Sequence, residues 1–477
     1  MSIINILWNK LNKKMIKINR KKKVTLGDYI SYKLWLFINR KVKNKKIINK
    51  ESVLIKKNLF YKFYPINELI KLEKLSFLSD DLKLSFLQEK IPEEKLSFII
   101  EAYLIQKRYD NSINRIKQKI INCEKITVCF VGYQEGNACD IFTPLYKEFK
   151  KDMHFDVSVI ILPYNHDSID NMIMHQEKSY QYLKTIGISA TKGYDEVTNK
   201  FLNNYNNYDI VFFEVAYDWV AKEFTTDNFP DALTFYLPYG QFLADNIQSH
   251  FDQKMMSKLY CIYPTSKSVA KMMKKYSLIN GMNISNIYLG NPKIQVFFDK
   301  NFKPKNVWKN QERRKKRIIW APHHMWANYS NFMEYKDFFL SLAKKYKDIL
   351  QIAFKPHPAL RSSLKEKKLM SEAEIEEYYN MWNDMENTQL ETGAWTDLFL
   401  TSDAMIMDSI AFMLEYSLSG KPSCVLYRVN EEGERIMKFS KSGEEIYNLL
   451  YHAKTFEDCE NFIKKVVFNE DDFKKES

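Results

Sequence analysis

The sequence is poor in the features that mark several common classes of protein. Six cysteines are scattered over 477 residues with no CxxC pair, which argues against a disulfide framework or zinc site and favours reduced thiols in a cytoplasmic protein. No run of eighteen apolar residues occurs, so we expect no segment that spans a bilayer. Charged residues interrupt the apolar start too often for a signal peptide. No GxGxxG motif is present, so a nicotinamide dinucleotide is not favoured as a ligand.

The net charge of +13 is concentrated at the start of the chain. Residues 1–60 hold 17 lysines and arginines and two acidic residues, so the other 417 residues carry a net charge of only −2. A nearly neutral body argues against nucleic acid as a partner. Residues 1–20 have apolar side chains at helical spacing opposite lysines, which predicts either a helix on an anionic membrane surface or one packed on its own protein. The apolar positions are Ile4, Leu7, Trp8, Leu11, Met15 and Ile18.

Beyond residue 122 the pattern predicts two α/β domains in tandem. Short apolar runs alternate with helix-length segments, which is typical of parallel, doubly wound sheets covered by helices. The alternation pauses near residue 300 and then restarts. We therefore expect a basic helical region over 1–122 and two Rossmann-like domains over 123–300 and 301–477. The expected strands are 126–132, 155–163, 208–214, 232–238, 258–264, 317–321, 350–354, 404–407 and 423–427, a helix is expected over 93–121, and residues 376–390 and 393–400 are expected to be helical.

Unusual polar residues follow several of these strands, where parallel sheets bind their ligands. In "LPYGQ", Tyr239 and Gly240 lie at a strand end, either as part of a site or as an ordinary turn. In "WAPHHMW", His323 and His324 follow a strand and a proline. A neutral imidazole there could take a proton from a hydroxyl, and a protonated one could hold phosphate oxygens. The spacing matches no metal motif, and one ring could simply pack in the protein.

The stretch "FKPHPALR" places Lys355, His357 and Arg361 within seven residues at a strand end. Each proline fixes its own φ and disfavours helix in the residue before it, so the segment holds His357 rigidly. Three possible cations suit a pyrophosphate better than a neutral sugar. The alternative for Lys355 and Arg361 is that they are ordinary solvated charges.

A helix is expected to begin at Asp408 and Ser409, after the strand "AMIM". Its free amides, its dipole and the Ser409 hydroxyl would form a seat for phosphate. Glu415 lies seven residues after Asp408, on the same helix face, where a carboxylate could accept hydrogen bonds from ribose hydroxyls. Alternatively, Asp408 or Ser409 only caps the helix and Glu415 lies on the surface.

The ordered set "LPYG", "GNPK", "WAPHH", "FKPHP" and "SDAMIMDSIAFMLEY" with a later "KP" resembles the CDP-glycerol glycerophosphotransferase family, the teichoic-acid-type polymerases and primases. The resemblance covers about residues 125–465. It implies a GT-B fold, in which two Rossmann-like domains face a cleft, with an N-terminal acceptor domain and a C-terminal nucleotide-donor domain. It also implies that the basic helical extension attaches the protein peripherally to the inner face of the cell membrane.

The resemblance further implies a reaction. Glycerol phosphate or a related polyol phosphate would pass from CDP-glycerol, or a similar CDP-linked donor, to a hydroxyl of a cell-surface glycan or lipid-linked acceptor, releasing CMP without a cofactor or metal. His357 would be a ligand of the donor pyrophosphate, and Asp408 and Glu415 match acidic positions of the family. The family's Trp-His-Gly element, whose histidine resembles a catalytic base, corresponds here to Pro238-Tyr239-Gly240.

These departures from the family leave the base and the donor open. His323 or His324 is then our candidate base, and the family's paired serines correspond to Ile410 and Ala411. One alternative is a GT-B nucleotide-sugar glycosyltransferase of capsule or lipooligosaccharide synthesis. Another is a non-catalytic scaffold at the membrane surface.

Overall fold

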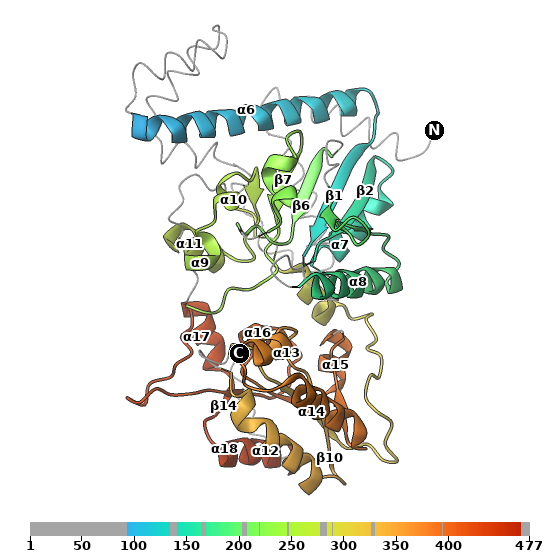
Figure 1. Ribbon diagram of the computed structural model, residues 1–477, viewed down its shortest axis with the longest axis vertical. Coiled ribbons are helices and arrows are strands. Elements are labelled where there is room, and N and C mark those ends of the chain that lie inside the picture. Colours follow the sequence, from blue (N-terminus) through green and yellow to red (C-terminus); the bar gives the residue numbers. More distant parts are fainter. Residues whose placement is uncertain are drawn as a thin grey trace. The chain divides into compact units, whose positions relative to one another are not determined.

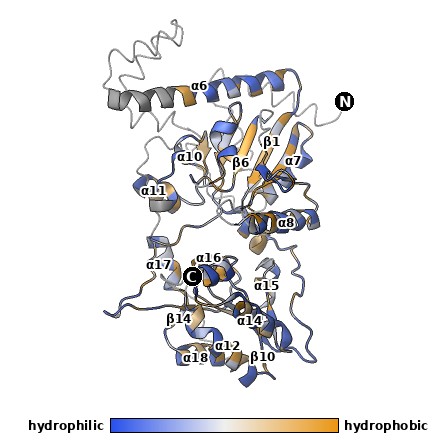
Figure 2. Ribbon diagram, viewed as in Figure 1, coloured by the Kyte–Doolittle hydropathy of each residue, from blue (hydrophilic) through white to orange (hydrophobic). Residues whose placement is uncertain are grey.

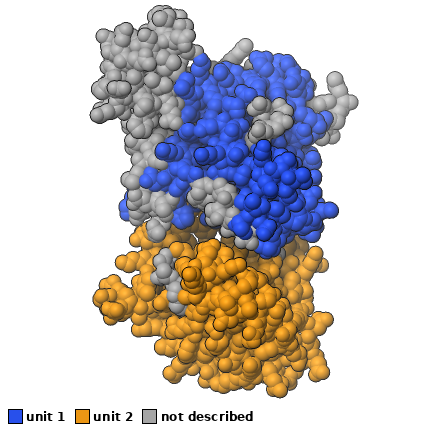
Figure 3. Space-filling view, in the orientation of Figure 1, with its two compact units in different colours: residues 1–134, 139–239, 250–292 blue, residues 135–138, 240–249, 293–477 orange. Residues whose placement is uncertain are grey.

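A computed structural model of the chain forms two compact units (Figures 1 and 3). Among the described residues, unit 1 comprises those from 93 to 239 and those between 250 and 292, and unit 2 comprises those between 240 and 249 and those from 293 onward. The proposed membrane helix over 1–20 lies outside the described residues. Within them, no helix is long and apolar enough to cross a membrane. The structure describes residues 93–133, 141–163, 168–202, 208–218, 220–245, 248–276, 284–288, 290–325, 330–393 and 395–468.

Unit 1 is built on a six-stranded parallel sheet in the order β3-β2-β1-β6-β7-β8. Counted within the sheet, this is the order 3-2-1-4-5-6 of the Rossmann fold. The strands are β1 (Ile126–Gly132), β2 (Phe155–Ile161), β3 (Thr191–Lys192), β6 (Ile210–Phe213), β7 (Leu233–Tyr236) and β8 (Cys261–Ile262). The helices are α6 (Glu93–Ile121), α7 (Thr143–Lys151), α8 (Ile169–Thr185), α9 (Gln248–Phe251), α10 (Lys254–Ser257) and α11 (Lys267–Tyr276), and β4 (Tyr194–Asp195) pairs with β5 (Lys200–Phe201) outside the sheet.

A row of aromatic rings forms the centre of the unit 1 core. Phe130, Phe212 and Phe235 occupy paired positions on β1, β6 and β7. Neighbouring ring centroids lie 5.0 and 5.1 Å apart, and Tyr263, just after β8, continues the row at 5.6 Å. Hydrophobic residues are concentrated on β1 and β6 (Figure 2). These rings hold the inner strands in register, and so they fix where each strand ends.

Unit 2 repeats the same topology in the order β11-β10-β9-β12-β13-β14, so the two expected Rossmann-like units are confirmed. The strands are β9 (Lys316–Ala321), β10 (Leu350–Phe354), β11 (Thr388–Leu390), β12 (Ala404–Met407), β13 (Ser423–Leu426) and β14 (Tyr451–Ala453). The helices are α12 (Phe332–Lys345), α13 (Leu360–Glu366), α14 (Glu372–Asp384), α15 (Trp395–Thr401), α16 (Ile410–Ser417), α17 (Lys441–Tyr447) and α18 (Phe456–Phe468).

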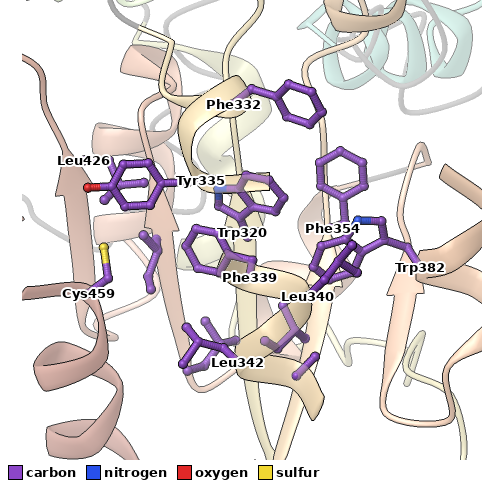
Figure 4. Packing of buried hydrophobic residues seen from close by; sticks show 14 of the residues in the cluster. Trp320, Phe332, Tyr335, Phe339, Leu340, Leu342, Phe354, Trp382, Leu426 and Cys459 are labelled. Carbon is purple, nitrogen blue, oxygen red and sulfur yellow. The ribbon is translucent and has the colours of Figure 1, made fainter. Parts of the chain in front are cut away.

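Trp320 lies at the centre of the unit 2 core (Figure 4). Its ring stacks on Phe339 of α12 with centroids 4.4 Å apart and on Phe354 of β10 at 5.0 Å. Burial of aromatic rings of this size dominates core energetics. This packing therefore anchors β9 and β10 at their carboxyl ends, which are followed directly by the histidines that the sequence singles out.

Residues 240–249 belong to unit 2 because their backbone pairs with residues near α17. Ala244 forms an antiparallel bridge with Phe439, and Ser440 N donates to Leu243 O at 2.8 Å. Gly443 permits this approach, since a Cβ at that position would lie 2.2 Å from the Leu243 carbonyl oxygen.

The expected helix over residues 376–390 needs one correction. Helix α14 ends at Asp384, and Thr388–Leu390 form strand β11. Thr388 pairs with Ile352 of β10 and is fully buried. The prediction was wrong because these few residues have a polar pattern, and pairing with a neighbouring strand rather than local propensity decides their conformation. Strands β3 and β14 were not predicted for a similar reason.

Candidate functional site

The polar residues of unit 2 gather where the strand order reverses, between β9 and β12. Ligands of doubly wound sheets bind at the carboxyl ends of the strands at this switch point. His323 and His324 follow β9, Lys355 and His357 follow β10, and Asp408 follows β12. Because β9 is paired with both other strands, segments that are far apart in the sequence reach the same edge of the sheet.

His323, His324 and His357 form a compact group that we call the histidine cluster. The ring centroids lie 4.3 Å apart for His323 and His324, 4.6 Å for His323 and His357, and 4.2 Å for His324 and His357. His357 N donates to Pro322 O at 3.0 Å, which ties the "FKPHP" segment to the turn after β9. The sequence predicts that each of these residues is part of a site, but it does not predict that the three rings meet.

Backbone amides fix the tautomers of two of these rings. Met325 N donates to His323 Nδ1 and Ala359 N donates to His357 Nδ1, each at 3.1 Å. A neutral imidazole that accepts at Nδ1 carries its hydrogen on Nε2. His323 and His357 therefore present Nε2–H donors. Neither Nε2 atom has a free lone pair that could take a proton. The hydrogen bonding therefore argues against His323 as the base, and His324 remains a candidate for that role.

The three histidines are neutral because of their surroundings. Burial, with His324 nearby, lowers the pKa of His357 to about 3, and burial lowers the pKa of His324 to about 4. Burial also lowers the pKa of His323 well below its ordinary value. The histidine cluster is thus a set of uncharged hydrogen-bonding groups at neutral pH. His357 is not the cation that its position in "FKPHPALR" suggests.

The histidine cluster also brings ring nitrogens close enough to hold a metal ion. Within the described part of the chain, one ligand atom from each ring lies within 4.8 Å of the others. Metal ligation uses an unprotonated nitrogen, whereas His323 and His357 carry a hydrogen on Nε2. The hydrogen bonding thus favours an oxygen-bearing ligand over a cation.

Asp408 fastens the turn after β9 to the end of β12. This carboxylate is 1% exposed and accepts hydrogen bonds from His323 N at 2.5 Å, Asn331 N at 2.6 Å and Asn331 Nδ2 at 3.3 Å. Burial raises the pKa of Asp408 to about 7 despite these donors. Because protein groups engage both oxygens, Asp408 positions His323 rather than being open to a ribose. Ser409 is the N-cap residue of α16, and its side chain makes no capping hydrogen bond.

Lys355 is the buried cation of the site. Its side chain is 7% exposed and Nζ donates to Gly393 O at 2.9 Å. Burial lowers the pKa of Lys355 to about 8, which the charge of Glu391 opposes. Lys355 therefore retains most of its charge at pH 7, and little solvent screens it.

An ion pair between Glu415 and Lys293 lies near Lys355, and the sequence predicts only part of it. Glu415 is buried, not on the surface, and its Oε1 lies 4.0 Å from Lys293 Nζ. Burial raises the pKa of Glu415. Lys293 Nζ also lies 5.4 Å from the centroid of the Trp395 ring. No pattern in the sequence predicts a role for Glu391, and Lys293 stands out only as the last residue of "GNPK".

Arg361 and Tyr239 are placed differently from the histidine cluster. The Arg361 guanidinium pairs with Glu372 at 2.7 Å and Glu376 at 2.5 Å, so its charge is already balanced by α14. Tyr239 belongs to unit 1 and Gly240 to unit 2. Arg361 therefore has two ion-pair partners on α14.

No protein-family model matches the chain, and no curated protein matches it. Among solved structures, it is similar to a UDP-N-acetylglucosamine 2-epimerase of Listeria monocytogenes described as putative, with 15% identity, 72% of this chain and 89% of that chain covered, and a TM-score of 0.44. It is also similar to the UDP-GlcNAc 2-epimerase of Neisseria meningitidis bound to UDP-GlcNAc, with 14% identity, 72% of this chain and 92% of that chain covered, and a TM-score of 0.43. A third similar structure is that of the wall teichoic acid polymerase TagF, with 12% identity, 79% of this chain and 93% of that chain covered, and a TM-score of 0.41. Identities this low assign no reaction to this chain.

Proposed function

We propose that the protein transfers glycerol phosphate, or a related polyol phosphate, from a CDP-linked donor to a hydroxyl of a glycan or lipid-linked acceptor. The observation that carries this proposal is that the segment after β10 holds both the fixed Nε2–H donor of His357 and the buried cation Lys355, at the switch point of a Rossmann-like sheet. Donors held in place by the protein stabilise phosphoryl oxygens without reorganising during the reaction.

The proposed step is a substitution at phosphorus. The acceptor oxygen forms a bond to the phosphorus that carries the polyol, and the bond from that phosphorus to the bridging oxygen breaks. CMP leaves with the electron pair, and a base takes the hydroxyl proton. Negative charge grows on the leaving phosphate, where Lys355 supplies a positive charge and His357 a hydrogen bond.

The nucleoside part of the donor would occupy the neighbouring region of unit 2. The start of α16, with Ser409, would hold a phosphate through free amides. Glu415 would accept hydrogen bonds from ribose hydroxyls. Its burial beside Lys293 supports an anionic acceptor that is shielded from water.

Replacing His357 by leucine, which has no hydrogen-bond donor, tests the proposed donor site. We expect binding of CDP-glycerol to weaken by about 10–100-fold, because a hydrogen bond to a charged group contributes about 1.5–3 kcal/mol. Isothermal titration calorimetry measures the affinity, and CMP release measures turnover. His452→Leu is the matched control, since His452 lies on β14 and its Nε2 donates to Tyr447 O. Equal affinity and equal CMP release in the two variants would show that His357 does not hold the donor.

A second candidate function keeps the fold but changes the donor. The absence of a histidine at Pro238-Tyr239-Gly240 favours a nucleotide-sugar glycosyltransferase of capsule or lipooligosaccharide synthesis. Thermal shifts with CDP, UDP and GDP separate the two functions. Selective stabilisation by UDP would contradict the CDP-linked donor.

The basic N-terminal region supports a peripheral location on the inner face of the membrane. If residues 1–20 form the attachment, a chain that lacks them should no longer sediment with vesicles containing anionic lipids, while the full chain does so at low salt. A truncated chain that sediments as fully as the full one would show that the attachment lies elsewhere.

A further inference from the structure

Helix α11 of unit 1 (Figure 1) has lysine side chains along its exposed side and no acidic residue of its own to balance them. The helix spans Lys267–Tyr276 with the sequence KSVAKMMKKY, which contains neither an acidic residue nor an arginine. Its residues Val269, Ala270 and Met273 are buried and pack it onto unit 1. We call the exposed lysines the lysine face of α11. They are Lys267, Lys271, Lys274 and Lys275.

The spacing of the lysine face is unfavourable for the helix itself. Its other members lie four, seven and eight residues after Lys267, so all four share one side of the helix. Like charges at this spacing repel each other and destabilise a helix. Lys267 is the first residue of α11, where the positive end of the helix dipole disfavours a cation. Only Lys274 and Lys275, in the last turn, are placed favourably for the dipole, so helix stability does not explain the pattern.

Lysines on other surface helices have partners within the protein. Lys151 of α7 pairs with Glu148 at 2.6 Å. Lys345 of α12 pairs with Glu460 of α18, also at 2.6 Å. In the part of the chain that the structure describes, no carboxylate forms such a pair with the first three lysines of the lysine face. The positive charge of α11 can therefore act on a partner at the surface of unit 1.

We propose that the lysine face of α11 binds the surface of a bilayer that contains anionic lipids. It gives the folded body a contact with the membrane in addition to the one expected from residues 1–20. The inference rests on the proposed peripheral location and is independent of the proposed transfer reaction. Each lysine near an anionic lipid surface adds to the attraction, so such a surface offsets the repulsion among the four cations.

The chemistry of the lysine face favours a lipid surface over other anionic partners. Lysine is a strongly hydrated point charge, whereas arginine forms the paired hydrogen bonds with which proteins recognise a particular phosphate or base. Helix α11 has no arginine, and proteins that bind single-stranded nucleic acid combine a basic groove with stacked aromatic side chains. The outer side of a helix is convex, which suits the diffuse negative charge of a lipid surface. We expect the contact to be reversible and to weaken with salt.

Replacing three lysines of this face by glutamine in the full-length chain tests the proposal. We expect this triple variant to bind vesicles of phosphatidylcholine and phosphatidylglycerol in equal parts at least about 10-fold more weakly at low salt, because three charges are lost from the contact. Cosedimentation measures the partition coefficient. The changes are Lys267→Gln, Lys271→Gln and Lys274→Gln. A control variant removes the same charge from exposed lysines of unit 2, by Lys303→Gln, Lys344→Gln and Lys347→Gln.

Equal partition coefficients for the two triple variants would overturn the proposal. Weaker binding to soluble polyphosphate without weaker binding to vesicles would also overturn it, because the partner would then be a soluble polyanion. The chain that lacks residues 1–20 tests the other attachment separately. If that chain no longer sediments and the lysine-face variant sediments like its control, the N-terminal attachment stands and the contact through α11 does not.

A change of charge at Lys267 separates a binding role from a structural one. Lys267→Glu places a carboxylate in the first turn, four residues before Lys271, and both effects favour the helix. We therefore expect the melting temperature to stay equal or to rise by about 1–2 °C, while vesicle binding weakens at least about fivefold. A Lys267→Glu protein that binds vesicles as tightly as the wild-type chain would show that Lys267 is an ordinary solvated charge, against the proposal.

Discussion

Replacing Asp408 by alanine is expected to destabilise unit 2 by about 3–5 kcal/mol. Each buried donor that loses its acceptor costs about 1–3 kcal/mol, and Asp408 accepts from more than one donor. The carboxylate is the acceptor for His323 N, Asn331 N and Asn331 Nδ2. All three donors are buried, so water cannot readily replace the lost oxygens. The same change should release the turn after β9 and weaken binding of CDP-glycerol.

Two further variants separate the lost hydrogen bonds from the lost side-chain volume. Asp408→Asn keeps the shape but turns an amide group toward backbone N–H donors, and we expect a loss of about 2–3 kcal/mol. Asp397→Ala is the control, since its carboxylate accepts from Lys305 N at an exposed position; its cost should stay below about 1 kcal/mol. Urea denaturation measures all three. An Asp408→Ala protein as stable as this control would mean that the hydrogen bonds accepted by Asp408 contribute little to stability.

The general position of the unit 2 site could be predicted from the sequence because it follows from strand order. The apolar runs that became β9, β10 and β12 end at the residues that the rule for parallel sheets selects. Asp408 and His357 could therefore be named without a structure. Their partners could not, since the contact of Asp408 with His323 depends on which strands pair across the sheet.

Side-chain charge and tautomer were not predictable from residue type. His357 and Arg361 look like cations beside Lys355 in the sequence. In the fold, burial neutralises His357, and Arg361 is balanced by Glu372 and Glu376.

The three histidines should make the stability of unit 2 depend strongly on pH. Their pKa values are lowered in the folded chain and return to about 6.5 on unfolding. Above pH 6.5 both states are uncharged and the effect is absent. Below pH 6.5, the unfolded chain binds protons that the folded chain does not. The free energy of unfolding therefore decreases as the pH is lowered, by up to about 4 kcal/mol per pH unit for the three histidines together. Asp408, Glu391 and Glu415 oppose this because burial raises their pKa values.

Comparison with His324→Gln isolates the contribution of the histidine cluster from these acids. Removing one histidine that stays neutral in the fold should reduce the slope of unfolding free energy against pH by about 1.4 kcal/mol per unit between pH 6 and 5. Urea unfolding followed by tryptophan fluorescence suits the measurement, because Trp308, Trp320 and Trp382 are buried in unit 2. Parallel slopes for the two proteins would mean that His324 binds its proton in the folded state. A cationic His324 would in turn remove the reason for treating the histidine cluster as uncharged donors to phosphate oxygens, since the three rings are in mutual contact.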